Sequence, residues 1–77
     1  MEELVLFIVK HLVSCPEQVS VKTEAEDDLN SIIYIKANEN DLGKIIGKGG
    51  KVVNSIRTIV KTIGNKTSKR YRIKIGE

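Results

Sequence analysis

Hydrophobic side chains near the start of the chain repeat with the period of a helix. A core-facing stripe predicts a helix over residues 2–14 that Pro16 ends, and the stripe consists of Leu4, Val5, Ile8 and Leu12. Four further apolar side chains fall partly on other faces of this helix: Leu6, Phe7, Val9 and Val13. Two interpretations fit them equally well. Either another chain covers part of this surface, or the helix is packed on several sides within a small core.

Two segments with a period of two follow and predict a β-hairpin. Val19, Val21 and Thr23 alternate with polar residues, as in a half-buried strand. The β-branched and aromatic residues of the run 31–37 predict a second strand. The acidic run 24–30 between them contains turn-forming residues, so we interpret it as a solvated turn. It lacks the glycine-containing loop of a calcium site, and no metal site is expected there.

The second half of the chain predicts two helices separated by glycines. Asn38 is expected to cap a short helix that ends at Gly47 and buries Leu42, Ile45 and Ile46. A longer helix is predicted over residues 51–63, with Gly64 as its C-terminal stop. The predicted core stripe of this longer helix consists of Val52, Ile56, Ile59, Val60 and Ile63.

A last strand, residues 69–75, has one apolar and one cationic face. Its alternating side chains are Arg70, Tyr71, Arg72, Ile73, Lys74 and Ile75. The element order is therefore helix, strand, strand, helix, helix, strand. We expect one α+β domain over residues 1–77, a two-layer sandwich with three helices on one face of a three-stranded sheet.

Charge is divided unevenly along the chain, although the net charge is only +3. Residues 1–41 contain three basic and nine acidic side chains, whereas residues 42–77 contain ten basic side chains and a single acidic one, Glu77. No carboxylate side chain occurs from Leu42 to Gly76. Such asymmetry indicates an electropositive surface that meets nucleic acid or another anion.

The composition argues against disulfides, export and catalysis. Cys15 is the only cysteine, which is typical of an intracellular protein when the domain is this small. The apolar run 4–9 is too short to span a bilayer, and Glu2 and Glu3 stand where a signal peptide is positive, so no membrane or export segment is expected. His11 is the sole histidine, and with Cys15 it supplies two ligands where a structural zinc site uses four. We therefore expect no enzyme activity, no metal and no cofactor.

Three glycines within four residues separate the two helices of the second half: Gly47, Gly49 and Gly50. Glycine permits a sharp turn and leaves room for close approach of a ligand backbone. The N–H groups at the start of the next helix suit phosphodiester groups, as do the surrounding cations Lys44, Lys48 and Lys51. The Walker A and dinucleotide-binding patterns do not fit, because the glycine spacing differs and no parallel βαβ unit is predicted.

The run from Ile45 to Ile56, I-I-G-K-G-G-K-V-V-N-S-I, resembles the signature of K-homology (KH) domains, I-I-G-x-x-G-x-x-I-x-x-I, with Val53 in one isoleucine position. In that family a G-x-x-G loop between two helices clamps about four nucleotides of single-stranded nucleic acid. The predicted element order resembles the type II KH fold, α-β-β-α-α-β, which implies a mixed sheet. The resemblance covers essentially the whole chain.

The length, the opening Met-Glu-Glu-Leu-Val and the segment Leu12-Val13-Ser14-Cys15-Pro16-Glu17 are similar to those of the small bacterial single-KH proteins of the KhpA type. This resemblance implies a cytoplasmic RNA chaperone or post-transcriptional regulator. It also implies a homodimer, or a heterodimer with a larger KH protein of the KhpB (Jag) type. In some members it implies a link to cell-envelope and cell-length control.

On the KH interpretation, single-stranded RNA lies in a groove. The loop 47–50 is expected to form one wall, and strand 31–37 with the basic loop 64–69 the other. The N–H groups of Gly49 and Gly50 are expected to hold phosphates. The full set of expected RNA-binding residues is Gly43, Lys44, Ile46, Gly47, Lys48, Gly49, Gly50, Lys51, Val52, Val53, Lys66, Lys69 and Arg70. The three aromatic residues are too few for a platform that stacks several bases.

Two other function classes fit the sequence less well. A protein-interaction module that supports a partner's RNA binding would depend on the spare apolar residues of helices 2–14 and 51–63 more than on Lys48. A small acyl or metabolite carrier is disfavoured because the second half is cationic and no exposed serine attachment motif is present.

Overall fold

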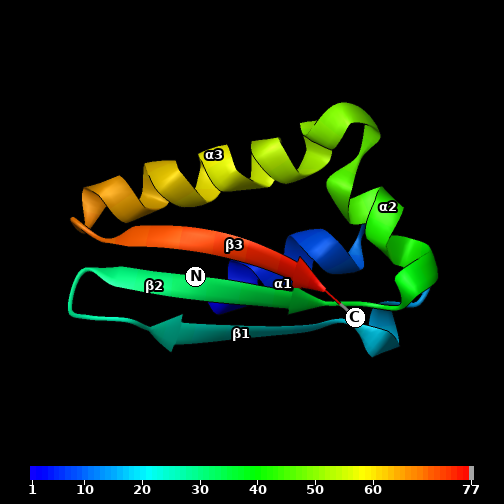
Figure 1. Cartoon of the computed structure of the whole chain (residues 1–77), viewed down its shortest axis with the longest axis horizontal. Helices are drawn as coiled ribbons and strands as arrows, with labels where there is room; N and C mark the ends of the chain where they lie inside the picture. Colours follow the sequence, from blue (N-terminus) through cyan, green and yellow to red (C-terminus); the bar gives the residue numbers. More distant parts are fainter. Residues whose placement is uncertain (77) are drawn as a thin grey trace.

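A computed structural model of the chain describes residues 1–76 as a three-stranded sheet with three helices on one of its faces (Figure 1). The main elements are α1 (Glu2–Lys10), β1 (Ser20–Ala25), β2 (Asn30–Lys36), α2 (Leu42–Ile46), α3 (Lys51–Lys66) and β3 (Arg70–Gly76). Three 3₁₀ turns connect them: η1 (Pro16–Gln18), η2 (Glu39–Asp41) and η3 (Lys48–Gly50). The predicted two-layer α+β fold is confirmed.

The sheet is mixed, with β2 in the centre. β1 pairs with β2 in an antiparallel hairpin, and β3 pairs with the other edge of β2 in parallel. The hairpin turn is closed by Asp27, whose Oδ1 accepts the N–H groups of Leu29 and Asn30, both at 2.8 Å. Hydrogen bonds from the Asn30 side chain and from these N–H groups lower the pKa of Asp27. The acidic run therefore contains the predicted turn, but the turn is shorter than expected, because β1 extends to Ala25 and β2 begins at Asn30.

One helix covers each outer strand of the sheet, and the remaining helix packs against another helix. α1 packs over β1, α3 packs over β3, and α2 packs against α3 (Figure 1). The side chains that are least exposed come from every layer of this arrangement: Val5, Val9, Ile33, Ile35, Ile45, Ile56 and Val60. One hydrophobic cluster therefore joins the described elements.

α1 ends earlier than predicted, at Lys10 rather than near residue 14. Its C-terminal turn is tightened by i→i−3 hydrogen bonds from the N–H groups of His11 and Leu12. The segment that follows is held instead by the buried carboxylate of Asp41, which is distant in the sequence. Helical periodicity cannot predict such a contact.

α3 extends beyond its predicted end, and Gly64 lies buried inside the helix rather than stopping it. A Cβ at this position would lie 2.7 Å from the carbonyl oxygen of Lys69 and 3.1 Å from the ring of Tyr71. Gly64 is therefore needed for the close approach of α3 and β3, and the helix continues to Lys66.

Several hydrophobic assignments also differ from the prediction. Ile46, Ile59 and Ile63 were expected in the core but are 40%, 41% and 37% exposed. Val9 was assigned outside the stripe of the first helix, yet it is fully buried, while Phe7 is 64% exposed. The packing of α1 on several sides thus accounts for Val9 and leaves Phe7 uncovered.

Candidate nucleic-acid interface

The glycine loop between α2 and α3 adopts conformations that side chains rarely allow. The φ angles of Gly47, Gly49 and Gly50 are +76°, +65° and +78°. A Cβ at Gly47 would lie 2.4 Å from Cγ2 of Val52, so this position requires glycine for space as well as for φ. A Cβ at Gly49 would contact no other part of the fold within 4 Å. Gly47 therefore permits the turn, while Gly49 faces open space.

Two backbone N–H groups of this loop are free to bind an anion. The Gly47 N–H donates to the Gly43 carbonyl at 2.8 Å, and the Gly50 N–H donates to the Gly47 carbonyl at 3.1 Å. The N–H groups of Lys48 and Gly49 have no backbone acceptor within residues 1–76. The expectation that Gly50 offers its N–H to phosphate is therefore corrected, because the free pair belongs to Lys48 and Gly49.

The lysines around the loop are not equivalent. Lys44 Nζ lies 3.5 Å from Oδ1 of Asp41 and donates a hydrogen bond to the hydroxyl of Ser14. Lys48 and Lys51 are exposed, and neither makes an ion pair within the described chain. The loop therefore presents two free ammonium groups beside the two free N–H groups.

Asp41 positions the helix that leads into the loop. Asp41 is 2% exposed, and its two side-chain oxygens accept the N–H groups of Ser14 at 3.1 Å and Cys15 at 3.0 Å. Burial raises the pKa of Asp41, but these hydrogen bonds and the Lys44 ammonium outweigh it and hold the pKa below its usual range. The ionised carboxylate thus anchors α2 to the segment that follows α1.

The side chains expected to form the groove floor differ in their exposure. Ile46 is exposed, and Val52 is partly buried against the core. Gly43 and Lys44 lie on the exposed side of α2. Val53 is only 5% exposed and belongs to the core cluster, so its assignment as a base-contacting residue is corrected.

The strand that lies beside α3 is β3 and not the strand 31–37 that was expected as the second wall of the groove. β2 occupies the centre of the sheet, and its two edges are paired with β1 and β3. β3 is one of the two edge strands of the sheet and lies beside α3 (Figure 1). An open pocket runs between α3 and this edge and is lined by Arg57, Lys61, Tyr71, Arg72 and Ile73.

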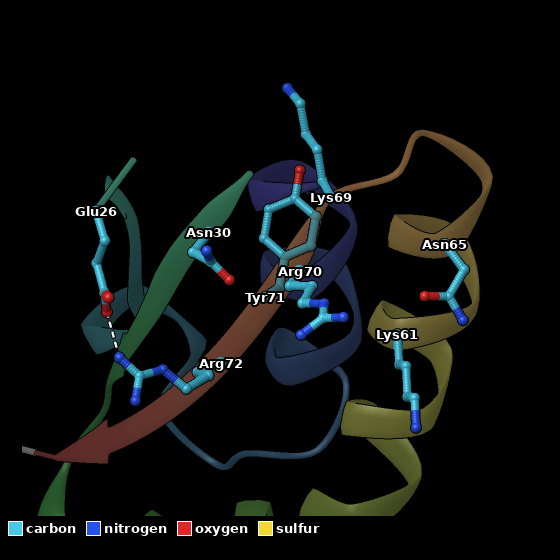
Figure 2. A pocket seen from close by; sticks show the side chains of 8 residues that line it. All are labelled: Glu26, Asn30, Lys61, Asn65, Lys69, Arg70, Tyr71 and Arg72. Carbon is cyan, nitrogen blue, oxygen red and sulfur yellow. Dashed lines mark hydrogen bonds and ion pairs between the residues drawn. The ribbon is translucent and has the colours of Figure 1, made fainter. Parts of the chain in front are cut away.

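A second pocket adjoins the first where the basic loop enters β3. Figure 2 shows its lining side chains, which come from the sheet on one side and from α3 on the other: Glu26, Asn30, Lys61, Asn65, Lys69, Arg70, Tyr71 and Arg72. The predicted residues Lys69 and Arg70 are among them, whereas Lys66 lines none of these pockets. The one carboxylate, that of Glu26, is paired with Arg72.

Sequence reasoning missed the cationic flank of α3. Arg57, Lys61 and Asn65 are spaced at i, i+4 and i+8, which places them on one side of the helix. The first two line the pocket along β3, and the last two line the pocket at its end. Helical spacing of the polar residues, read in the same way as that of the apolar ones, identifies this flank.

The glycine loop directly precedes α3, whereas the α3 residues that line the basic pocket, Lys61 and Asn65, lie toward the other end of the helix. α3 has 16 residues, which corresponds to a length of about 24 Å. Along the helix, Arg57 lies between the glycine loop and the residues that line the basic pocket.

Other classes of site are not found in the part of the chain that the structure describes. No helix within residues 1–76 is long and apolar enough to cross a membrane. The same residues contain no group of three or more His, Cys, Asp or Glu side chains placed to hold a metal ion.

Comparison with known proteins gives a consistent result over the full length. Residues 2–75 match the family model of the KhpA/KhpB KH domain. The chain is 42% identical to RNA-binding protein KhpA of Listeria monocytogenes over 77 residues, which is all of both chains. It is 37% identical to the protein of the same name from Clostridium acetobutylicum over 75 residues, covering 97% of this chain and 99% of that one. It is 34% identical to RNA-binding protein KhpA of Borreliella burgdorferi over 73 residues, covering 95% of this chain and 88% of that one. No solved structure matches the chain.

Proposed function

The chain belongs to the KhpA/KhpB family of KH domains, and from this premise we propose that it binds single-stranded RNA at the glycine loop and along the groove between α3 and β3. The relatives it matches are named RNA-binding proteins. The function is one of binding, without catalysis.

The free anion-binding groups of the glycine loop carry this proposal. The free N–H groups and the exposed ammonium groups belong to four consecutive residues, 48–51, and a Cβ at Gly49 would meet nothing within 4 Å. These groups recognise phosphodiester oxygens and leave the bases unread. Arg57 and Lys61 continue the positive charge along α3 toward the basic pocket.

Neighbouring hydrophobic side chains supply the base contacts in this proposal. Ile46 is exposed on α2, and Val52 is partly exposed at the start of α3. Both are aliphatic, so they can pack against a base but cannot stack with it as an aromatic ring would. We therefore expect modest affinity and weak base preference from a single domain.

Reversal of charge in the loop tests the proposed function. The double variant Lys48→Asp/Gly49→Asp places carboxylates at the two free N–H groups, and the measurement is fluorescence polarisation with a short labelled single-stranded RNA of random sequence. We expect at least a tenfold loss of affinity, since charge-assisted contacts are replaced by repulsion of phosphate. Circular dichroism verifies that the variant remains folded.

A matched control separates loop chemistry from net charge. Lys10→Asp/Gln18→Glu changes the net charge by the same amount on α1 and η1, outside the groove. This control should bind RNA almost as tightly as the wild type. Equal binding by wild type and the loop variant would contradict the proposed site.

A partner chain forms the second part of the proposal, as a homodimer or as a heterodimer with a KH protein of the KhpB (Jag) type. Ile59 and Ile63 are exposed and spaced at i, i+4 on α3, and Phe7 is exposed on α1. Apolar groups that remain exposed in this way favour association with another chain. RNA-chaperone activity in the cytoplasm and the link to cell-envelope and cell-length control belong to the same proposal.

Light scattering tests the role of this apolar surface. Ile59→Glu/Ile63→Glu should shift the wild-type dimer to a monomer, whereas Thr58→Glu/Thr62→Glu has the same spacing and added charge on exposed positions and should not. A monomeric wild type would contradict homodimerisation.

The alternative function, an interaction module with little RNA affinity of its own, is favoured by the same exposed isoleucines. It predicts that the isolated wild type binds RNA with little affinity even though the dimer forms. The two measurements above therefore distinguish it from direct RNA binding.

A further inference from the structure

The face of the sheet opposite the helices carries a pattern that the groove does not use. Alternation along the strands sends Ile33, Ile35 and Ile73 to the core and their neighbours to the open face. The open face of the three strands consists of Ser20, Lys22, Glu24, Asn30, Ile32, Tyr34, Lys36, Arg70, Arg72 and Lys74. Cations on this face outnumber carboxylates, and they surround the one aromatic ring.

The centre of the open face is a row of three side chains from three strands. Lys22 of β1 lies opposite Tyr34 of β2, and Tyr34 lies opposite Lys74 of β3. Side chains paired across strands in this way are about 5 Å apart at Cβ. Both lysines are exposed and Tyr34 is partly exposed, while the other tyrosine, Tyr71, packs against α3.

We propose that this open face is a second contact for single-stranded RNA, in which Tyr34 stacks on one base while Lys22 and Lys74 hold the phosphates on either side. The inference rests on the proposed function, because the ligand is the same RNA strand after it leaves the groove. An exposed ring flanked by cations is the arrangement that binds single strands without sequence preference. A single ring gives one stacking position, not a platform for several bases.

A cationic path connects the groove with this face. The pocket in Figure 2 extends around the free edge of β3, with Lys61 and Asn65 on the α3 side and Arg70 and Arg72 on the strand. From Arg72 the next outward-facing residue of β3 is Lys74, which borders Tyr34. An RNA strand that passes the basic pocket therefore reaches the open face over β3, which has no carboxylate side chain.

The carboxylates on and beside the open face do not oppose this path. Glu26 is paired with Arg72 across the central strand. Ile32 lies beneath this pair and is only 8% exposed, although it is not part of the core cluster. Glu24 lies on β1, farther from the β3 edge. The positive charge is therefore concentrated on β3 and beside Tyr34, where the RNA is expected to arrive.

The proposal is tested with two RNA lengths and a matched pair of variants. A labelled tetranucleotide, the length that one KH loop clamps, reports on the groove, and a strand of about 12 nucleotides reaches the open face as well. Tyr34→Thr removes the ring and keeps a β-branched strand residue, whereas Tyr34→Phe keeps the ring. We expect Tyr34→Thr to weaken binding of the longer RNA about tenfold, with no change for the tetranucleotide. Tyr34→Phe should bind like the wild type.

A second variant and an NMR measurement do not depend on the stability of Tyr34→Thr. Lys22→Gln/Lys74→Gln should weaken binding of the longer RNA only. The control Lys10→Gln should leave binding of both RNAs unchanged. Amide resonances of Lys22, Tyr34 and Lys74 in the wild type should shift on addition of the longer RNA and stay unchanged with the tetranucleotide.

The outcomes separate this inference from the proposed function. If both RNAs bind through the glycine loop and the Tyr34 and lysine variants bind normally, the second contact is wrong and the proposed function stands. If Tyr34→Thr and Tyr34→Phe weaken binding of the longer RNA equally, stacking on the ring is refuted. If the wild type binds neither RNA, both are wrong.

Discussion

The carboxylate of Asp41 binds the backbone of Ser14, with its Oδ1 accepting the Ser14 N–H at 3.1 Å across 27 positions of sequence. Oδ2 accepts the next N–H, that of Cys15, at 3.0 Å. The side chain of Asp41 thus holds the segment that follows α1 against the start of α2. Because α2 leads directly into the glycine loop, the position of the loop depends on this contact.

Stability should therefore depend on the ionisation of Asp41. Its pKa is lower in the folded protein than its usual value of about 3.9, so it stabilises the fold above about pH 4 and this contribution is lost as the pH falls through the folded pKa. Asp41→Asn should lower the melting temperature at neutral pH. Between neutral and acidic pH, the melting temperature of the variant should fall less than that of the wild type. Thermal denaturation of both proteins at a series of pH values measures this. Parallel pH profiles for the two proteins would contradict the role of Asp41.

Gly64→Ala should destabilise the protein even though alanine is the better helix former. The added Cβ would overlap the carbonyl oxygen of Lys69 and press on the ring of Tyr71. Overpacking of this kind costs about 1–3 kcal/mol in free energy of unfolding. Gly43→Ala is the matched control, because a Cβ there meets nothing within 4 Å and the helix should gain stability. Urea denaturation distinguishes the two, and a stabilised Gly64→Ala would show that α3 and β3 separate readily.

Regular periodicity predicts the fold well, and close contacts between elements explain where it fails. Alternation predicts β1, β2 and β3, and the glycine run locates the turn between α2 and α3. The role of Gly64 depends on β3, which the local sequence cannot place against α3. The end of α1 likewise depends on Asp41.

Local sequence also predicts the glycine loop better than the opposite wall of the groove. The positive φ angles of the glycines and the position of the lysines follow from residues 47–51. Which N–H groups remain free does not, because the Gly50 N–H donates to the Gly47 carbonyl within the turn. The wall depends on strand order, and a parallel β3 added to the far edge of β2 cannot be deduced from the alternation of either strand. For this reason the sequence places Lys48 in the loop but does not place Arg57 and Lys61 beside β3.

Alanine at the first and second glycines of the loop, Gly47 and Gly49, should have different effects. Gly47→Ala should be strongly destabilising, since its Cβ would lie 2.4 Å from Val52 and its φ is +76°. Gly49→Ala meets no neighbouring group, so only the strain of a φ of +65° remains, about 1 kcal/mol. The free energies of unfolding of the two variants, from urea denaturation, should therefore rank wild type, Gly49→Ala, Gly47→Ala. The reverse order would mean that the loop can rearrange around Val52.

The salt dependence of RNA binding should report how many phosphates the loop and the α3 flank hold. If about three phosphates are contacted, the logarithm of the affinity should fall with the logarithm of the salt concentration at a slope of about −2, because each single-strand phosphate releases about 0.7 counterions. Lys48→Gln removes one of these contacts and should reduce the slope by about 0.7. Lys44→Gln should change it less, since that ammonium already lies 3.5 Å from Asp41. Fluorescence polarisation titrations at several salt concentrations measure all three slopes. A wild-type slope near zero would refute phosphate recognition, and an equal effect of the two substitutions would mean that Lys44 leaves Asp41 when RNA binds.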